Sequence, residues 1–161
     1  MLDHHCESTV LVSAPMDSVF ARLDDHARLA AHMSESSWQM AGGRMSVSLD
    51  AERGRKVGSH IVLSGRILGI SLFVDEVVTV RDPPQRKTWE TVGRPRLLVI
   101  GGYRMGFELA PESSGSRLRV FIDYDLASDG LLARWLGSAY ARWCTGRMAR
   151  DAAAAFSASQ T

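Results

Sequence analysis

Apolar and polar residues alternate with two different periods along this chain, and the change of period predicts the order of its elements. Residues 8–14 place Val10, Val12 and Ala14 on one face and Thr9, Leu11 and Ser13 on the other, which predicts a strand. Pro15 follows, where its fixed φ suits the start of a helix, and helical spacing of apolar residues then continues to Leu23. A strand-rich body comes next, and Gly130 to Ser157 carries one long helical pattern.

The middle of the chain predicts a second short helix and then a series of strands. Asp25 is a candidate N-cap for that helix, whose apolar side is formed by Leu29, Ala30 and Met33. Glycine-rich turns and the Asp82-Pro83-Pro84 stop separate the strands that follow. Extended segments are expected at residues 38–40, 45–49, 59–68, 72–80, 87–92, 97–110 and 118–126.

The long C-terminal helix needs an apolar surface to lie against, and a curved antiparallel sheet offers a concave one. Gly101 and Gly102 interrupt the longest strand pattern, where glycines mark bulges or bends. Asp129 is a good N-cap for the helix. Its expected apolar face, with small residues for close approach to the sheet, consists of Leu132, Trp135, Leu136, Ala139, Trp143 and Gly146, opposite Arg134, Ser138 and Ala141. Such an arrangement tends to enclose a pocket.

Composition limits the choice of class. A chain of 161 residues is the size of one domain, so residues 1–161 are expected to fold as a single unit. The net charge of +1 gives no global field that would argue for a nucleic acid or an anionic membrane as partner. No apolar stretch approaches the roughly 20 residues needed to span a bilayer, so no integral membrane association is expected. Cys6 and Cys144 lack metal spacing and suggest a reducing compartment, which favours a cytoplasmic location.

Taken in order, the segments resemble the START-like (SRPBCC) superfamily, whose helix-grip fold is shared by Bet v 1, lipid-transfer domains and bacterial polyketide-cyclase-like proteins. The resemblance covers essentially the whole chain and implies an α+β fold. It implies a curved seven-stranded antiparallel sheet wrapped round the C-terminal helix, two short helices after the first strand, and a cavity. The chain departs from the family's pattern at His32-Met33, where such proteins often carry a tryptophan near the end of the second short helix. The matching segments are Val12-Ser13-Ala14-Pro15 with Val19-Phe20, Val78–Pro84 with Arg86, Lys87 and Trp89, and Gly115–Tyr124.

Motifs for metal, cofactor or nucleophilic chemistry are weak. His4, His5 and Cys6 are adjacent in an extended segment, so their side chains point to opposite faces and cannot converge on a metal. Residues 101–106 lie inside a strand pattern and lack the spacing of a phosphate-binding loop. The sequence has no Gly-x-Ser-x-Gly elbow. No metal and no cofactor are therefore expected.

Glu76 is the most informative polar residue, because it interrupts an apolar face. Val74 and Val78 flank it at the same alternation. If that face lines the concavity, Glu76 is a partly buried carboxylate whose surroundings raise its pKa. It would then orient a polar ligand group or act as a general base. The alternatives are a bulge that rotates Glu76 outward and a structural pair with an arginine; Arg104 is expected to face away from Tyr103 and Met105.

The sequence thus predicts a binding protein for an apolar or aromatic small molecule, such as a lipid, isoprenoid or polyketide-like compound. Binding without catalysis is expected, because no second catalytic partner for Glu76 stands at a diagnostic spacing. One alternative is a polyketide cyclase/dehydrase-like enzyme that uses the same cavity. Another is an interaction scaffold with a filled core, and a homodimer through edge strands is left open. Expected ligand contacts are His32, Glu76, Trp89, Tyr103, Met105, Tyr124, Trp135 and Trp143.

Overall fold

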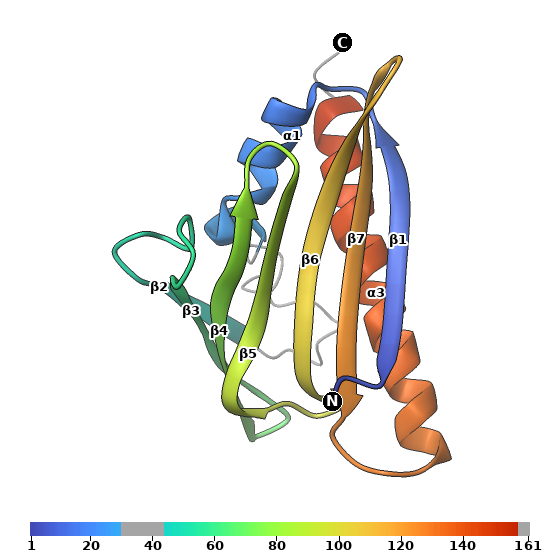
Figure 1. Cartoon of the computed structure of the whole chain (residues 1–161). Helices are drawn as coiled ribbons and strands as arrows, with labels where there is room; N and C mark the ends of the chain where they lie inside the picture. The colour runs from blue at the N-terminus through green and yellow to red at the C-terminus, as the bar shows by residue number, and fades with distance from the viewer. Residues whose placement is uncertain (30–43, 158–161) are drawn as a thin grey trace.

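A curved antiparallel sheet grips one long helix in the computed structural model of the chain (Figure 1). The structure describes residues 1–29 and 44–157. The helix-grip fold expected from the resemblance is confirmed. The elements are β1 (His4–Val12), α1 (Met16–Leu23), β2 (Arg44–Leu49), β3 (His60–Ile67), β4 (Ile70–Asp82), β5 (Arg86–Arg96), β6 (Ile100–Glu112), β7 (Gly115–Leu126) and α3 (Leu131–Ser157). The strands lie in the order β1-β7-β6-β5-β4-β3-β2.

Irregularities in three strands bend the sheet. The pairing of β6 with β7 shifts between Ile100 and Tyr103, which places the expected bulge at Gly101 and Gly102. The pairing of β4 with β5 shifts twice, once between Val78 and Val80. These shifts increase local twist and help the sheet curve around α3. The expected strands are found with small changes of boundary, except that the segment at residues 38–40 lies outside the described residues.

The two helical segments after β1 begin where the sequence predicts. Pro15 occupies the N-cap position with φ −67° and ψ 155°, one residue earlier than a first helical residue, and α1 then ends at Leu23. Residues 26–29 are helical, and the backbone N–H of Arg28 donates to Oδ1 of Asp25 over 3.4 Å. Asp25 therefore caps the second helical segment as expected.

The face of α3 that packs on the sheet differs from the expected one. Trp135 is 68% exposed and Leu132 is 69% exposed, so the N-terminal part of the expected apolar face points to solvent. The helix instead approaches β7 at Gly137, where an added Cβ would lie 2.5 Å from a methyl carbon of Leu126. Small buried residues such as Ala141 allow this close approach. The helix buries Gly137, Ala141, Thr145, Met148, Ala149 and Ala152.

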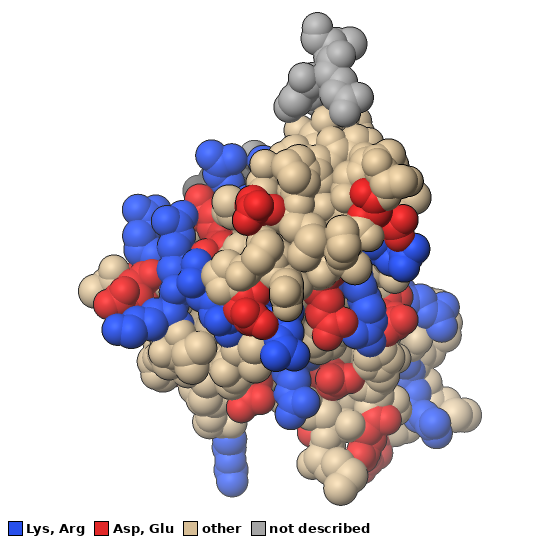
Figure 2. Space-filling view, turned by 45° about the horizontal axis from the view of Figure 1, so that its top comes forward, with Lys and Arg blue, Asp and Glu red and all other residues tan. Residues whose placement is uncertain are grey.

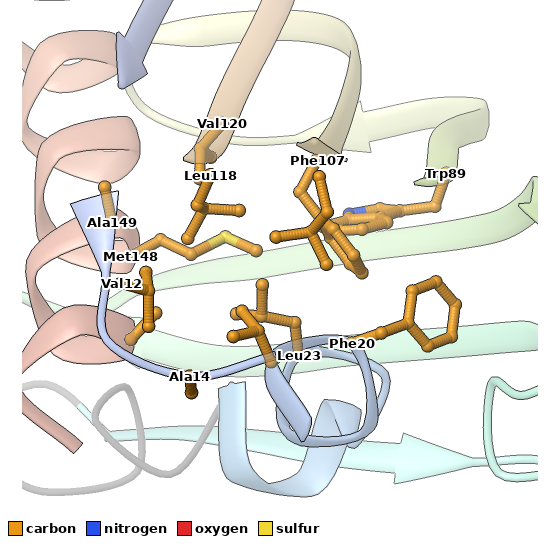
Figure 3. Close-up of a cluster of buried hydrophobic side chains, with 13 residues drawn as sticks. Val12, Ala14, Phe20, Leu23, Trp89, Phe107, Leu118, Val120, Met148 and Ala149 are labelled. Atoms are coloured by element: carbon orange, nitrogen blue, oxygen red, sulfur yellow. The ribbon is translucent and has the colours of Figure 1, made fainter. Parts of the chain in front are cut away.

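The C-terminal half of α3 closes one end of the fold with a packed apolar core (Figure 3). Met148 reaches from α3 toward Leu118 and Val120 of β7, and Phe20 and Leu23 of α1 lie on the other side of the cluster. Phe20 also packs against Phe107 of β6 with ring centroids 5.5 Å apart. The cavity begins at the edge of this core, where Leu23, Trp89 and Met148 belong to the cluster and also line the cavity.

Candidate functional site

A cavity of about 690 Å³ lies between the concave face of the sheet and α3. This volume falls within the range of about 300–1,000 Å³ that is typical of small-molecule sites. Strands β2 to β7 contribute its floor, and Tyr140, Trp143 and Met148 of α3 contribute to its opposite wall. The floor is mostly apolar and includes Met45, Ile61, Leu63, Ile67, Leu72, Val74, Ile100, Met105 and Ile122.

Glu76 is a buried carboxylate in this apolar floor. Its flanking residues Val74 and Val78 are each 1% exposed, and Glu76 itself is 4% exposed, so the strand alternation turns all three inward. The phenolic O–H of Tyr103, on β6, donates a hydrogen bond to Oε1 of Glu76. Both residues line the cavity. Of the alternatives, the structure therefore shows the one in which Glu76 faces the concavity. Glu76 is not rotated outward, and no arginine among the described residues pairs with it.

The surroundings of Glu76 favour its neutral form. Burial raises the pKa of Glu76 to about 7, against the lowering effect of hydrogen bonds from Tyr103 and Trp89. The neighbouring charge of Asp75 adds to the rise. Burial also raises the pKa of Tyr103 well above its usual value, with the charge of Glu76 as a further cause. Within the described part of the chain no cationic side chain pairs with Glu76, so its charge is met only by hydrogen bonds.

His26 lies at the edge of the same site. Its ring meets that of Trp89 edge to face, with centroids 4.9 Å apart, and Cδ2 of His26 lies so close to Gly54 that an added Cβ would come within 2.8 Å of it. Burial lowers the pKa of His26 to about 3, and the charge of Lys87 contributes in the same direction. Among the described residues its Nε2 has no hydrogen-bond partner. At neutral pH His26 therefore lines the cavity as an uncharged ring.

A second buried carboxylate, Asp24, lies near His26 in the sequence and is paired with two cationic side chains. Nζ of Lys87 lies 2.7 Å from Oδ1 of Asp24, and the guanidinium of Arg81 donates to Oδ2 of Asp24 over 2.8 Å. Burial opposes the charge of Asp24, but the hydrogen bonds from Arg81 and Lys87 outweigh it and lower the pKa of Asp24. Lys87 is 0% exposed. Sequence reasoning missed this cluster, although Lys87 shares the inward alternation of Trp89.

The α3 wall adds aromatic and sulfur groups but no nucleophile. The rings of Tyr140 and Trp143 lie with centroids 6.0 Å apart, and both residues line the cavity. Burial raises the pKa of the Cys144 thiol to about 12, so the group stays protonated at neutral pH. The wall can therefore supply contact surface and weak polar contacts. Among the described residues no group of His, Cys, Asp and Glu side chains has the arrangement of a metal site.

The structure brings together five of the eight residues expected to contact a ligand. Two others lie elsewhere: Tyr124 is buried beside Gly137 of α3 and stacks on His4 with ring centroids 5.2 Å apart, and Trp135 is exposed on α3. The placement of Trp135 follows from the rotation of the α3 face. His32 lies outside the described residues. The residues that line the cavity are Glu76, Trp89, Tyr103, Met105 and Trp143.

Comparisons with solved structures support the fold. Ara h 8.0201 aligns with a TM-score of 0.69 at 12% identity, covering 96% of this chain and 98% of that one. The major latex-like protein 151 of Panax ginseng aligns at 0.57 and 12% identity, covering 92% and 95%. A protein from Chromobacterium violaceum aligns at 0.64 and 17% identity, covering 94% and 96%. The chain thus has the helix-grip architecture of Bet v 1-like proteins.

The sequence also matches a known family over nearly its full length. Residues 3–158 match the family described as "Polyketide cyclase / dehydrase and lipid transport", and the chain belongs to that family. No curated protein sequence matches it. The description of this family names both catalysis and transport, so membership establishes the fold but not the ligand. The ligand has to be inferred from the cavity.

Proposed function

We propose that this chain binds an apolar or aromatic small molecule, of lipid, isoprenoid or polyketide-like character, in the cavity between its sheet and α3. The observation that carries the proposal is a cavity of about 690 Å³ with an apolar floor and one buried polar pair, Glu76 and Tyr103. Burial of apolar ligand surface would supply about 25 cal/mol per Å² before the entropic costs of association. The polar pair would orient the ligand within the cavity.

The state of Glu76 limits the charge of the ligand. Below about pH 7 the buried carboxyl is neutral and can donate as well as accept a hydrogen bond. Above that pH it is an anion in an apolar cavity and disfavours a second anion beside it. An uncharged hydroxyl or carbonyl group is therefore the polar group that suits this site over the whole neutral range, and a ligand carboxylate suits it poorly.

Titration with 2-naphthol, followed by its fluorescence, tests the proposal. Wild type should bind it, and Leu72→Trp should bind it at least tenfold more weakly, because the indole would occupy part of the cavity that Leu72 lines. Phe121→Trp is the matched control, since the neighbouring Ile122 is the residue of β7 that lines the cavity and Phe121 points to the other face. Equal binding by all three proteins would contradict a cavity site.

A second candidate function is acid–base catalysis in the same cavity, and the Glu76–Tyr103 pair favours it. A carboxylate with a pKa near 7 is well matched to removing a proton from carbon at neutral pH. The phenolic O–H of Tyr103 donates to Oε1 of Glu76 and so orients the carboxylate in the cavity. In such a step the carboxylate takes a proton from the carbon next to a ketone carbonyl. The electron pair of the broken C–H bond forms a C=C bond, and the carbonyl π pair moves to the oxygen to give an enolate.

The catalytic candidate is tested separately from binding. Wild-type protein in deuterated buffer would speed the exchange of the protons next to the carbonyl of 1-tetralone, followed by proton NMR. Glu76→Gln would abolish the acceleration while keeping the shape of the cavity. Binding of 1-tetralone without faster exchange would assign the protein to the binding class and exclude this chemistry for simple ketones.

A further inference from the structure

Exposed apolar side chains gather at one end of the molecule, the lower end in Figure 1. They come from three segments that all lie at this end: the β3–β4 turn, the β5–β6 connection and the start of α3. Among the described residues ten large apolar side chains are exposed, and seven of them belong to these three segments. These seven, here termed the apolar end, are Leu68, Ile70, Leu98, Leu131, Leu132, Trp135 and Leu136.

The local backbone keeps the side chains of the apolar end exposed to solvent. Leu68 is 78% exposed and adopts a positive φ of 50°, which is uncommon for a residue with a branched side chain. Leu132 and Trp135 are displayed by the first two turns of α3, because the helix packs on the sheet only from Gly137 onward. Separate apolar tips on different elements can each enter a fluid layer. A rigid protein partner would require a continuous complementary surface.

The charges at this end are suited to an anionic surface. Arg66, Arg94, Arg96 and Arg134 are exposed there. Within the described residues none of the four forms an ion pair, whereas most cationic side chains elsewhere do, for example Arg119 with Glu7 and Glu108. Three aspartates, Asp3, Asp125 and Asp129, lie at the β1–β7 side of the same end. The opposite end, which comes forward in Figure 2, carries Lys or Arg and Asp or Glu side chains interspersed.

The cavity reaches the apolar end. Leu98 is 46% exposed and also lines the cavity, next to Leu97 and Val99 of the same connection. Ile67, which precedes the Leu68 tip, lines it as well. A ligand that leaves the cavity near these residues would therefore pass directly among exposed apolar side chains.

From this arrangement we propose that the apolar end docks reversibly on the surface of a lipid bilayer. Leucine tips and the indole of Trp135 enter the boundary between headgroups and acyl chains, where an amphipathic indole is favoured. The four arginines, which form no ion pair among the described residues, contact anionic headgroups. No helix of the described residues is long and apolar enough to cross a bilayer, so the contact is peripheral. Exchange of a cavity ligand with the bilayer would rest on the proposed function, but docking itself does not.

Vesicle co-sedimentation of the full chain tests the proposal. Wild type should bind vesicles of phosphatidylcholine mixed with phosphatidylglycerol. Leu132→Ser/Trp135→Ser should bind them at least about tenfold more weakly, because two apolar side chains no longer enter the layer. Leu11→Ser is the matched control: Leu11 is 62% exposed and belongs to β1, at the opposite end of the sheet. Arg94→Gln/Arg96→Gln should weaken binding to the mixed vesicles and leave binding to phosphatidylcholine alone unchanged.

A second readout identifies the residues at the lipid. Vesicles with brominated acyl chains should quench tryptophan fluorescence in wild type and quench it much less in Trp135→Phe, which keeps an apolar side chain in the same place. Absence of vesicle binding, or equal losses with Leu11→Ser, would overturn the proposal. So would a dimer in sedimentation analysis that Leu132→Ser/Trp135→Ser converts to a monomer, because the apolar end would then bind a second copy. Failure of 2-naphthol binding with intact vesicle binding would contradict only the cavity function.

Discussion

Two buried carboxylates on the concave side of the sheet are treated in opposite ways. Asp24 is held by Lys87 and Arg81, and its pKa is lowered. Glu76 has no cationic partner among the described residues and accepts a hydrogen bond from Tyr103, and burial raises its pKa to about 7. Asp24 links the end of α1 to β4 and β5 through these ion pairs, whereas Glu76 faces the cavity. A paired charge indicates a structural role here, and an unpaired one marks the site.

Breaking the pair at Asp24 should have the largest effect on stability. Lys87→Met leaves a buried carboxylate with Arg81 alone, and removal of one partner of a buried pair costs about 3–5 kcal/mol in the free energy of unfolding. Urea denaturation monitored by circular dichroism measures it. Asp24→Asn/Lys87→Met, which removes both charges, should recover part of the loss. A cost below about 0.5 kcal/mol for the single variant would show that the pair is not structural.

Removing the charge at Glu76 should have a smaller effect of the opposite sign. The unfolded carboxyl ionises near pH 4.5 and the folded one near 7, so between these values the folded state holds the extra proton. The free energy of unfolding therefore falls as pH rises from about 4.5 to about 7 and then levels off, by about 3 kcal/mol at most. Glu76→Gln should remove this slope and stabilise the protein at about pH 8 by about 2 kcal/mol.

Thermal denaturation of wild type and Glu76→Gln across this pH range checks the sign. Glu90→Gln is the matched control, because Glu90 forms only a partly exposed contact with Arg104. Glu76→Gln less stable than wild type at about pH 8 would mean that the ionised carboxylate is stabilised by contacts other than those with Tyr103 and Trp89.

Weakening the hydrogen bond to Glu76 should have the smallest effect on stability. Tyr103→Phe removes a donor that lowers the pKa of Glu76, so that pKa should rise above 7. The free energy of unfolding should change by about 1 kcal/mol. Carbon NMR of labelled glutamate carboxyl groups follows the shift. An unchanged or lower pKa in Tyr103→Phe would show that the hydrogen bond does not control this carboxyl.

The alternation of apolar residues was enough to predict the strands. It placed Glu76 on the same face as Val74 and Val78, but a bulge or an arginine pair stayed open until the structure showed Glu76 lining the cavity. The face of α3 could not be predicted in the same way. Its first turns carry Leu132 and Trp135, which look like core residues, but close contact with β7 is possible only at small residues such as Gly137 and Ala141. The Lys87–Asp24 pair was missed because it joins residues far apart in the sequence.

The measurement that tests the central claim most directly is the titration of Glu76 with and without a cavity probe. Carbon NMR of labelled Glu and Asp carboxyl groups would be recorded in wild type alone and with 2-naphthol. We expect Glu76 to titrate near pH 7, and its carboxyl resonance to shift when 2-naphthol binds. Asp24 should have a lowered pKa, and its resonance should not respond to 2-naphthol. Titration of Glu76 near its ordinary value of 4.5, with no response to the probe, would contradict a buried carboxyl facing a ligand cavity.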